Sequence, residues 1–294
     1  MTESTVKTTD AVVRFLFDNH GVRGEIVALN ESATRLIENH HYAAPVKRLM
    51  QELSACASLM AATVKTNTRI TVQMQGGKNA KLKYALVNVA PDLSFYGSAV
   101  PVEGVKIEDS AAFKDLVGEN GSLIISVFPE DGERFQGVVG LDKDNVAAAL
   151  EDYFLSSEQL PTRFFILSDP KGNGVYGILL QIIPNIDGNR DSLEHLSVLT
   201  ATMSFDEMDE VGIMEALRRL YAEETVRVFK ERKVSFRCVC SRERCENTLT
   251  SLPRKELEEI AADPHGTTLT CAHCQRSYHF TKEELEALLL KVSQ

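Results

Sequence analysis

The first part of the chain changes from a strand-like to a helix-like pattern of hydrophobic positions. β-Branched and aromatic residues predict two strands within residues 11–29, with a turn at His20-Gly21 between them. From Pro45 to Val64 the apolar residues recur at helical spacing, which predicts a helix with one buried face. Cys56 lies at the edge of that face. We therefore interpret it as a buried, unreactive thiol.

In the region that follows, from Thr68 onward, apolar residues recur at every second position. This pattern predicts antiparallel strands at residues 70–74, 82–86, 93–97, 123–128 and 135–141. A helix is predicted at residues 147–154, with Asp144 as its cap, and the elements together indicate an α+β domain over residues 1–184. We expect this N-terminal domain to contain a large, mostly antiparallel sheet with helices packed on it.

Three glycines from Gly172 to Gly177 have the spacing of a dinucleotide-binding loop. Such a loop needs a helix after it, whereas residues 175–183 are β-branched and strand-like. We therefore predict a hairpin between residues 163–167 and the strand from Val175. No phosphate-binding loop of the Gly-x-x-x-x-Gly-Lys-Ser/Thr type occurs in the sequence, and we expect no ATP dependence.

Residues 185–233 are more highly charged than the rest of the chain. Charged side chains make up eighteen of these forty-nine residues, against 25% over the whole sequence. Capping patterns predict one helix from Asp191 through Thr202 and another after Ser204, although Gly212 should cost the second up to about 1 kcal/mol relative to alanine. The segment is either an ordinary pair of solvated helices or, as we expect, a linker that is folded only while it packs on a neighbour.

The last part of the chain, residues 234–294, contains two close pairs of cysteines. Cys238 and Cys240 are separated by one residue, and Cys271 and Cys274 by two. In an extended segment, residues i and i+2 point the same way, and a tight turn brings together the members of the second pair. Two converging pairs of thiols are the usual donor set of a tetrahedral zinc ion. We expect one zinc ion per chain, with helices at residues 252–260 and 283–292 completing the module.

Other side chains compete for places in this site. Cys245 follows the first pair and His279 follows the second, but neither belongs to a pair that already faces one point. We interpret His273, inside the turn of the second pair, as a solvated histidine. A site closed by four cysteines has no open position for water or substrate, so the sequence indicates a structural or sensing role and no catalytic residues. Bound thiolates remain open to oxidation wherever solvent reaches them.

Charge and composition exclude several classes of protein. A net charge of −10 argues against broad binding to nucleic acid or anionic membranes, and no segment has the length and apolar character of a membrane span or signal peptide. We expect a cytoplasmic protein whose six cysteines are reduced at rest. Cations nevertheless outnumber acids between residues 231 and 282: Arg232, Lys233, Arg237, Arg242, Arg244, Arg254, Lys255, Arg276 and Lys282. A zinc-stabilised nucleic-acid or protein-interaction module therefore remains the alternative.

Several stretches resemble the heat shock protein 33 family of redox-regulated holdase chaperones. The stretches are Phe236 to Cys245, Cys271 to Phe280, Arg23-Gly-Glu25, Tyr153 to Thr162 and Gly177 to Pro184. By this resemblance Cys238, Cys240, Cys271 and Cys274 are the zinc ligands, and oxidation links Cys238 to Cys240 and Cys271 to Cys274 with release of zinc. The segment Asp263-Pro-His-Gly266 departs from the acidic turn that is more usual in the family.

The resemblance implies a function that the residues alone do not reach. We expect an ATP-independent chaperone, not an enzyme, that is closed when reduced and binds unfolding client proteins after oxidation. We further expect a homodimer in the oxidised state and no nucleic-acid partner. An oxidoreductase is a weaker hypothesis, because no Cys-x-x-Cys opens a helix in a βαβ setting.

Overall fold

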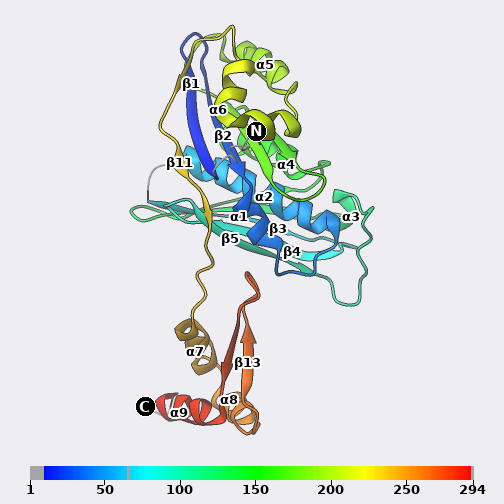
Figure 1. Cartoon of the computed structure of the whole chain (residues 1–294), viewed down its shortest axis with the longest axis vertical. Helices are drawn as coiled ribbons and strands as arrows, with labels where there is room; N and C mark the ends of the chain where they lie inside the picture. The colour runs from blue at the N-terminus through cyan, green and yellow to red at the C-terminus, as the bar shows by residue number, and fades with distance from the viewer. Residues whose placement is uncertain (1–9, 65–66, 293–294) are drawn as a thin grey trace, which may run out of the picture. The chain divides into compact units, whose positions relative to one another are not determined.

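A computed structural model of the chain describes residues 10–64 and 67–292. These residues form two compact units that divide between Arg237 and Cys238 (Figure 1). The sequence-based division into residues 1–184, 185–233 and 234–294 stays a prediction. The charged segment 185–233 belongs to the first unit.

The first unit contains a six-stranded sheet whose strands come from both ends of the unit. Its central strands are β1 (Ala11–Phe17), β2 (Val22–Leu29), β9 (Val175–Ile182) and β8 (Thr162–Ser168), in that order and antiparallel. Two short strands, β10 (Val226–Val228) and β11 (Arg232–Lys233), pair with β1 on its outer side. The hairpins around His20-Gly21 and before Val175 are therefore confirmed.

A second six-stranded sheet carries most of the strands predicted from the period-two pattern. Its order is β12-β5-β4-β3-β6-β7. The bounds are β3 (Thr68–Gln75), β4 (Leu82–Val89), β5 (Ser94–Pro101), β6 (Ser122–Pro129), β7 (Phe135–Gly140) and β12 (Ser235–Phe236). Only the β12–β5 pair is parallel among these described strands. The α+β class is confirmed, but the strands divide between two sheets where the sequence indicated one.

Helix α2 (Ala44–Thr63) lies between the two sheets (Figure 1). It contacts β2 and β9 of one sheet and β3, β4 and β5 of the other. Because both sides of the helix are covered, fourteen of its twenty residues are buried, Cys56 among them. The sequence predicted this helix and the burial of its thiol correctly, but it indicated one buried face where the structure covers both sides.

Three shorter helices complete this part of the unit: α1 (Glu31–Ile37), α3 (Phe113–Val117) and α4 (Val146–Ser156). The hydrophobic pattern indicated only α4. Its predicted cap was wrong, because Asn145 accepts the hydrogen bond from the Ala148 amide at 2.9 Å. Asp144 instead forms an ion pair with Lys114.

The charged segment forms two helices, α5 (Asn189–Thr200) and α6 (Phe205–Leu220). The predicted start of α5 at Asp191 was wrong, since the helix begins two residues earlier, after Gly188 with its left-handed backbone. The Ser204 cap of α6 is confirmed by a hydrogen bond from the Glu207 amide. Gly212 does more than weaken α6, because its φ of 76° and ψ of 161° break the helix in two.

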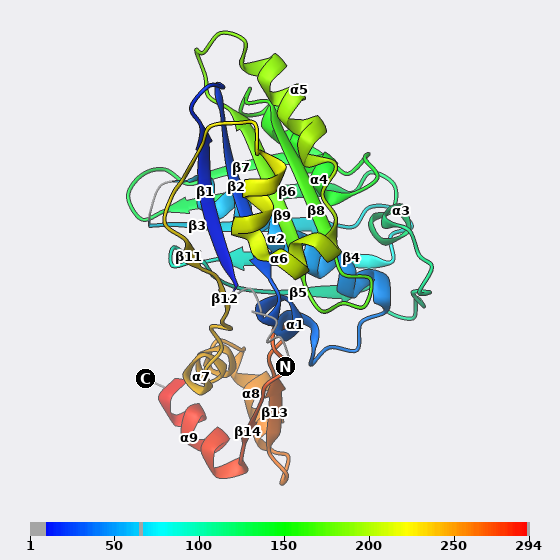
Figure 2. The same ribbon diagram turned by 45° about the horizontal axis from the view of Figure 1, so that its top comes forward.

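Both helices pack on the face of the first sheet that turns away from α2 (Figure 2). On the sheet side the buried cluster includes Phe15, Phe17, Ile26 and Tyr176. On the helix side the buried residues are Leu193, Leu196, Met208, Ile213, Ala216, Leu217 and the adjoining Tyr221. The charged segment thus covers an apolar sheet face. The Thr200 and Tyr221 hydroxyls bond within this core at 2.7 Å.

The second unit contains a small hairpin and three helices. The hairpin consists of β13 (Thr267–Thr270) and β14 (Ser277–Phe280), and the helices are α7 (Arg242–Thr250), α8 (Arg254–Ala261) and α9 (Lys282–Val292). Its core consists of few buried side chains: Leu249, Leu257, Ala261, Phe280, Leu285 and Leu288. A core of this size contributes little stability on its own. In the described part of the chain, no helix has the length and apolar character needed to cross a membrane.

Candidate metal centre

Two short arms of the second unit carry the four cysteines. Cys238 and Cys240 lie on the segment that precedes α7, and Ser241 then caps that helix by accepting a hydrogen bond from the Arg244 amide. Val239, between the two thiols, is exposed. The first pair therefore has the expected form, in which alternate residues share one direction.

The second arm is the tip of the β13–β14 hairpin. The Cys271 amide donates to the Arg276 carbonyl, and the Gln275 amide donates back to the Cys271 carbonyl, both at 2.9 Å. Gln275 has a φ of 58°, which lets the chain reverse tightly between the strands. This turn brings Cys271 and Cys274 to one side of the hairpin.

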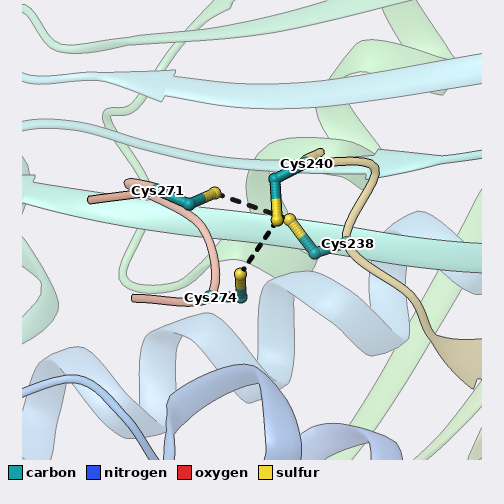
Figure 3. A group of neighbouring side chains, drawn as sticks. All are labelled: Cys238, Cys240, Cys271 and Cys274. Carbon is teal, nitrogen blue, oxygen red and sulfur yellow. Dashed lines mark hydrogen bonds between the residues drawn. The ribbon is translucent and has the colours of Figure 1, made fainter. Parts of the chain in front are cut away.

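The four sulfur atoms converge on one point (Figure 3). All four lie within 4.8 Å of one another. Cys238 and Cys271 are 3.6 Å apart, and Cys240 and Cys274 are 3.4 Å apart, measured between Sγ atoms. Ligands about 2.3 Å from a tetrahedral zinc ion stand about 3.8 Å from one another. The cluster therefore has the size and donor chemistry that fit zinc.

Hydrogen bonds distinguish the sulfurs from one another. The Tyr278 hydroxyl donates to Cys240 Sγ at 3.3 Å, and the His273 amide donates to Cys271 Sγ at 3.4 Å. Burial, followed by hydrogen bonds with neighbouring thiols, raises the pKa of Cys238. Burial also opposes ionisation of Cys240, but the bonds from Tyr278 and the other thiols outweigh it and lower its pKa. The sequence analysis did not identify Tyr278 as a partner of a sulfur atom. Tyr278 lies four residues after Cys274 but bonds to Cys240, and no sequence pattern indicates that contact.

The other candidate ligands lie elsewhere in the unit. Cys245 is on α7 and packs against the small apolar core. His279 is exposed, and its Nδ1 bonds to the Thr268 hydroxyl at 3.1 Å. His273 was expected to be solvated, but it is partly buried. The structure thus brings together the two close pairs and leaves Cys245 and His279 out of the sulfur cluster.

Arg242 joins the elements around the centre. Its guanidinium donates to the His279 carbonyl at 2.8 Å and to the Glu284 carboxylate at 2.6 Å. It also lies over the Phe280 ring, with 4.3 Å from Cζ to the ring centroid. This one cation therefore links α7, β14 and α9 directly beside the cysteine arms.

Comparison with known proteins shows to which family the chain belongs. Residues 10–281 match the family described as Hsp33 protein. The chain belongs to the Hsp33 family. It is similar to the 33 kDa chaperonins of Escherichia coli strains SMS-3-5 / SECEC and K12 / DH10B, each 41% identical over 278 residues and 94% of both chains.

A solved structure shows the same fold. The crystal structure of the 33 kDa chaperonin (heat shock protein 33 homolog) from Thermotoga maritima covers 97% of this chain and all of its own. The TM-score is 0.81 at 23% identity. The Hsp33 relatives are named chaperonins. Family membership therefore confirms the predicted resemblance and supports a chaperone function, not an enzymatic one.

Proposed function

We propose that this Hsp33-family chain is an ATP-independent holdase that is switched on by oxidation of its cysteines. The observation that carries the proposal is the convergence of four sulfurs within 4.8 Å, each on a residue of intermediate burial. A metal centre that oxidants can reach is suited to sensing. In the reduced state, Cys238, Cys240, Cys271 and Cys274 would hold one zinc ion. When bound, the ion supplies a cross-link between the two arms.

Oxidation would remove the thiolates on which this cross-link depends. In each pair, two thiolates would give up two electrons to hydrogen peroxide, which takes two protons from solvent and becomes two molecules of water while one sulfur–sulfur bond forms. We propose that the pairs are Cys238 with Cys240 and Cys271 with Cys274. The two sulfur contacts of 3.6 and 3.4 Å run between the arms, so cross-arm pairing is the outcome that would contradict this assignment.

The packing of the charged segment supports the link from oxidation to client binding. Helices α5 and α6 cover an apolar face of the first sheet. Short helices are marginal by themselves, and α6 is also broken at Gly212. If loss of the metal centre loosens the segment 185–233, apolar side chains of both the sheet and the helices become available to unfolding proteins. We place this activity in the cytoplasm, with a homodimer as the oxidised form.

The alternative, a zinc-stabilised nucleic-acid or protein-interaction module without redox switching, has no specific observation in its favour among the described residues. It was suggested by the cations of the last part of the chain. Two of them, Arg242 and Arg254, are paired with Glu284 and Glu258 inside the module. Their charges are therefore partly neutralised before any phosphate is met.

The decisive experiment measures zinc content and suppression of client aggregation side by side. We expect the reduced protein to hold one zinc and to leave a denaturing client unprotected, and the peroxide-treated protein to have lost zinc and to hold the client without ATP. Peptide mapping then identifies the disulfides. An oxidised protein without holdase activity would refute the proposal.

Matched serine variants test the ligands. Replacing Cys240 by serine should remove most of the zinc affinity, because three thiolates remain for four positions. Replacing Cys245, which lies nearby on α7, should leave zinc content unchanged. Equal loss of zinc in the two variants would show that the ligand assignment is wrong.

A further inference from the structure

A second group of metal-binding side chains lies within the first unit. It consists of His20 in the turn between β1 and β2, His195 on α5, and Glu224, which follows α6. One ligand atom of each residue lies within 4.8 Å of the other two. Three separate segments supply them, so no local pattern in the sequence marks the group.

Both imidazoles are directed at the same carboxylate. His20 Nε2 lies 2.8 Å from Glu224 Oε2, and His195 Nε2 lies 2.8 Å from Glu224 Oε1. The two rings stand side by side, with centroids 5.8 Å apart and planes inclined by 32°. One carboxylate therefore bridges the two imidazoles, and one ligand atom from each of the three residues is close to the other two.

The remaining nitrogen of His20 is held as it is in metal-binding histidines. Its Nδ1 lies 3.0 Å from Ser192 Oγ. A partner on Nδ1 fixes the ring orientation and keeps Nε2 directed at Glu224, the place where an ion would bind. Such a partner is the usual outer arrangement around a ligating histidine. The ring of Phe17 also meets the His20 ring edge-on, with centroids 6.0 Å apart. His20 is thus positioned by contacts that need no metal.

The backbone that carries Glu224 is fixed in the same way. Its amide donates to the Tyr221 carbonyl at 3.0 Å, and the carbonyl of the next residue, Thr225, accepts from the Asp18 amide at 3.0 Å. The Glu224 side chain is 12% exposed and that of His20 is 19% exposed. His195, at 53%, forms the side on which an ion could enter.

We propose that His20, His195 and Glu224 form a second site for a divalent transition-metal ion, with zinc as the best fit. Two imidazole nitrogens and one carboxylate are a common zinc donor set, whereas calcium and magnesium prefer oxygen ligands throughout. Ligand atoms about 2.1 Å from an ion stand further apart than the present 2.8 Å, so the separations must widen by about half an ångström. Binding of the ion would displace the Nε2 proton that faces Glu224 and leave His20 with its proton on Nδ1, which donates a hydrogen bond to Ser192 Oγ.

Such an ion would fasten the charged segment to the first sheet. His195 and Glu224 belong to residues 185–233, and His20 belongs to the β1–β2 turn. Occupancy would therefore oppose the release of α5 and α6, and oxidative activation would require more time or heat. This regulatory consequence rests on the proposed function, whereas the metal site itself does not.

The site can be tested by adding Co²⁺ to the reduced full-length protein whose cysteines already hold zinc. Cobalt on nitrogen and oxygen ligands absorbs weakly in the visible range, whereas cobalt on thiolates adds a strong sulfur-to-metal charge-transfer band. We expect one additional Co²⁺ per chain without that band. The variants His195→Gln and Glu224→Gln should weaken its binding by about tenfold or more, in keeping with the sensitivity of metal sites to changes around them. Glutamine keeps the size of Glu224 and one of its acceptors.

His41→Gln is the matched control, because His41 is an exposed histidine of the same unit outside the group. It should bind Co²⁺ like the parent. Three results would overturn the site: the parent binds no additional Co²⁺, the added Co²⁺ shows the charge-transfer band that reports exchange at the cysteines, or all variants bind it equally. Proteolysis within residues 185–233 should slow with added zinc in the parent and not in Glu224→Gln. Cleavage that zinc leaves unchanged in the parent would overturn the regulatory consequence.

Discussion

Cys56 differs from the cysteines of the candidate metal centre in its surroundings. It is fully buried on α2, and this burial raises the pKa of its thiol well above the usual range. The thiolate is the reactive form, so almost none is present at neutral pH. We expect Cys56 to resist iodoacetamide and peroxide in the folded protein and to react only after unfolding. Mass spectrometry of labelled peptides, with Cys245 as the partly exposed comparison, checks this. Labelling of Cys56 at the rate of Cys245 would contradict it.

Gly212 provides a second test at the scale of one residue. Its φ of 76° and ψ of 161° lie in a region that only glycine enters readily. We expect Gly212→Ala to destabilise the first unit by roughly 1–3 kcal/mol, measured by urea unfolding. Helix propensity alone predicts the opposite sign, a gain of up to about 1 kcal/mol. Glu210→Ala, on the same helix and exposed, should stay within about 0.5 kcal/mol of the parent. A stabilised Gly212→Ala protein would mean that α6 can straighten at little cost.

At the scale of elements, helix α6 tests whether the charged segment is the switch. Leu217 is 2% exposed and packs in the core that joins α6 to the first sheet. Its replacement by alanine should cost about 2–5 kcal/mol, comparable to the stability of a marginal segment. We expect the reduced, zinc-loaded Leu217→Ala protein to hold clients. Aggregation assays measure the holding of clients, and limited proteolysis measures the loosening of residues 185–233.

Met214 supplies the matched control on the same helix, since its side chain is 49% exposed. Met214→Ala should keep the protease resistance of residues 185–233 and leave the reduced protein inactive. If Leu217→Ala behaves in the same way, with full resistance and no holdase activity, the segment is not the switch.

The elements also show what hydrophobic patterning can and cannot predict. The strands and α2 could be predicted because their apolar residues recur at every second position in the strands and at helical spacing in α2. Helix α7 was missed, because Leu249 is the one fully buried residue among its nine, so the helix shows no apolar periodicity. The cysteine pairs were found because each pair is local. The group of His20, His195 and Glu224 could not be found, since folding alone brings those segments together.

At the scale of the whole molecule, the metal should decide whether the second unit is folded. Structural zinc contributes about 10–16 kcal/mol of apparent binding free energy, against about 5–15 kcal/mol for the net stability of a whole domain. The small apolar core of this unit contributes little stability that could replace that of the metal. We expect chelation of zinc under reducing conditions to unfold residues 238–292, with rapid hydrogen exchange throughout. Strands β2 and β9 should stay protected, and zinc should restore the second unit. Protection that persists there without zinc would show that the core suffices.

The three short strands β10, β11 and β12 also have a consequence for the state in which the chain would hold clients. They cover the outer side of β1 in one sheet and of β5 in the other. In the segment between β10 and β11, the Phe229 amide also donates to the Arg14 carbonyl of β1. If residues 226–236 detach, each sheet is left with an open row of backbone amides and carbonyls. An extended polypeptide could join either row as an additional strand, through main-chain bonds that do not depend on its sequence. The same unpaired strand edges would let two released chains pair with each other. The protein concentration would then determine whether a released chain binds a client or a second copy of itself.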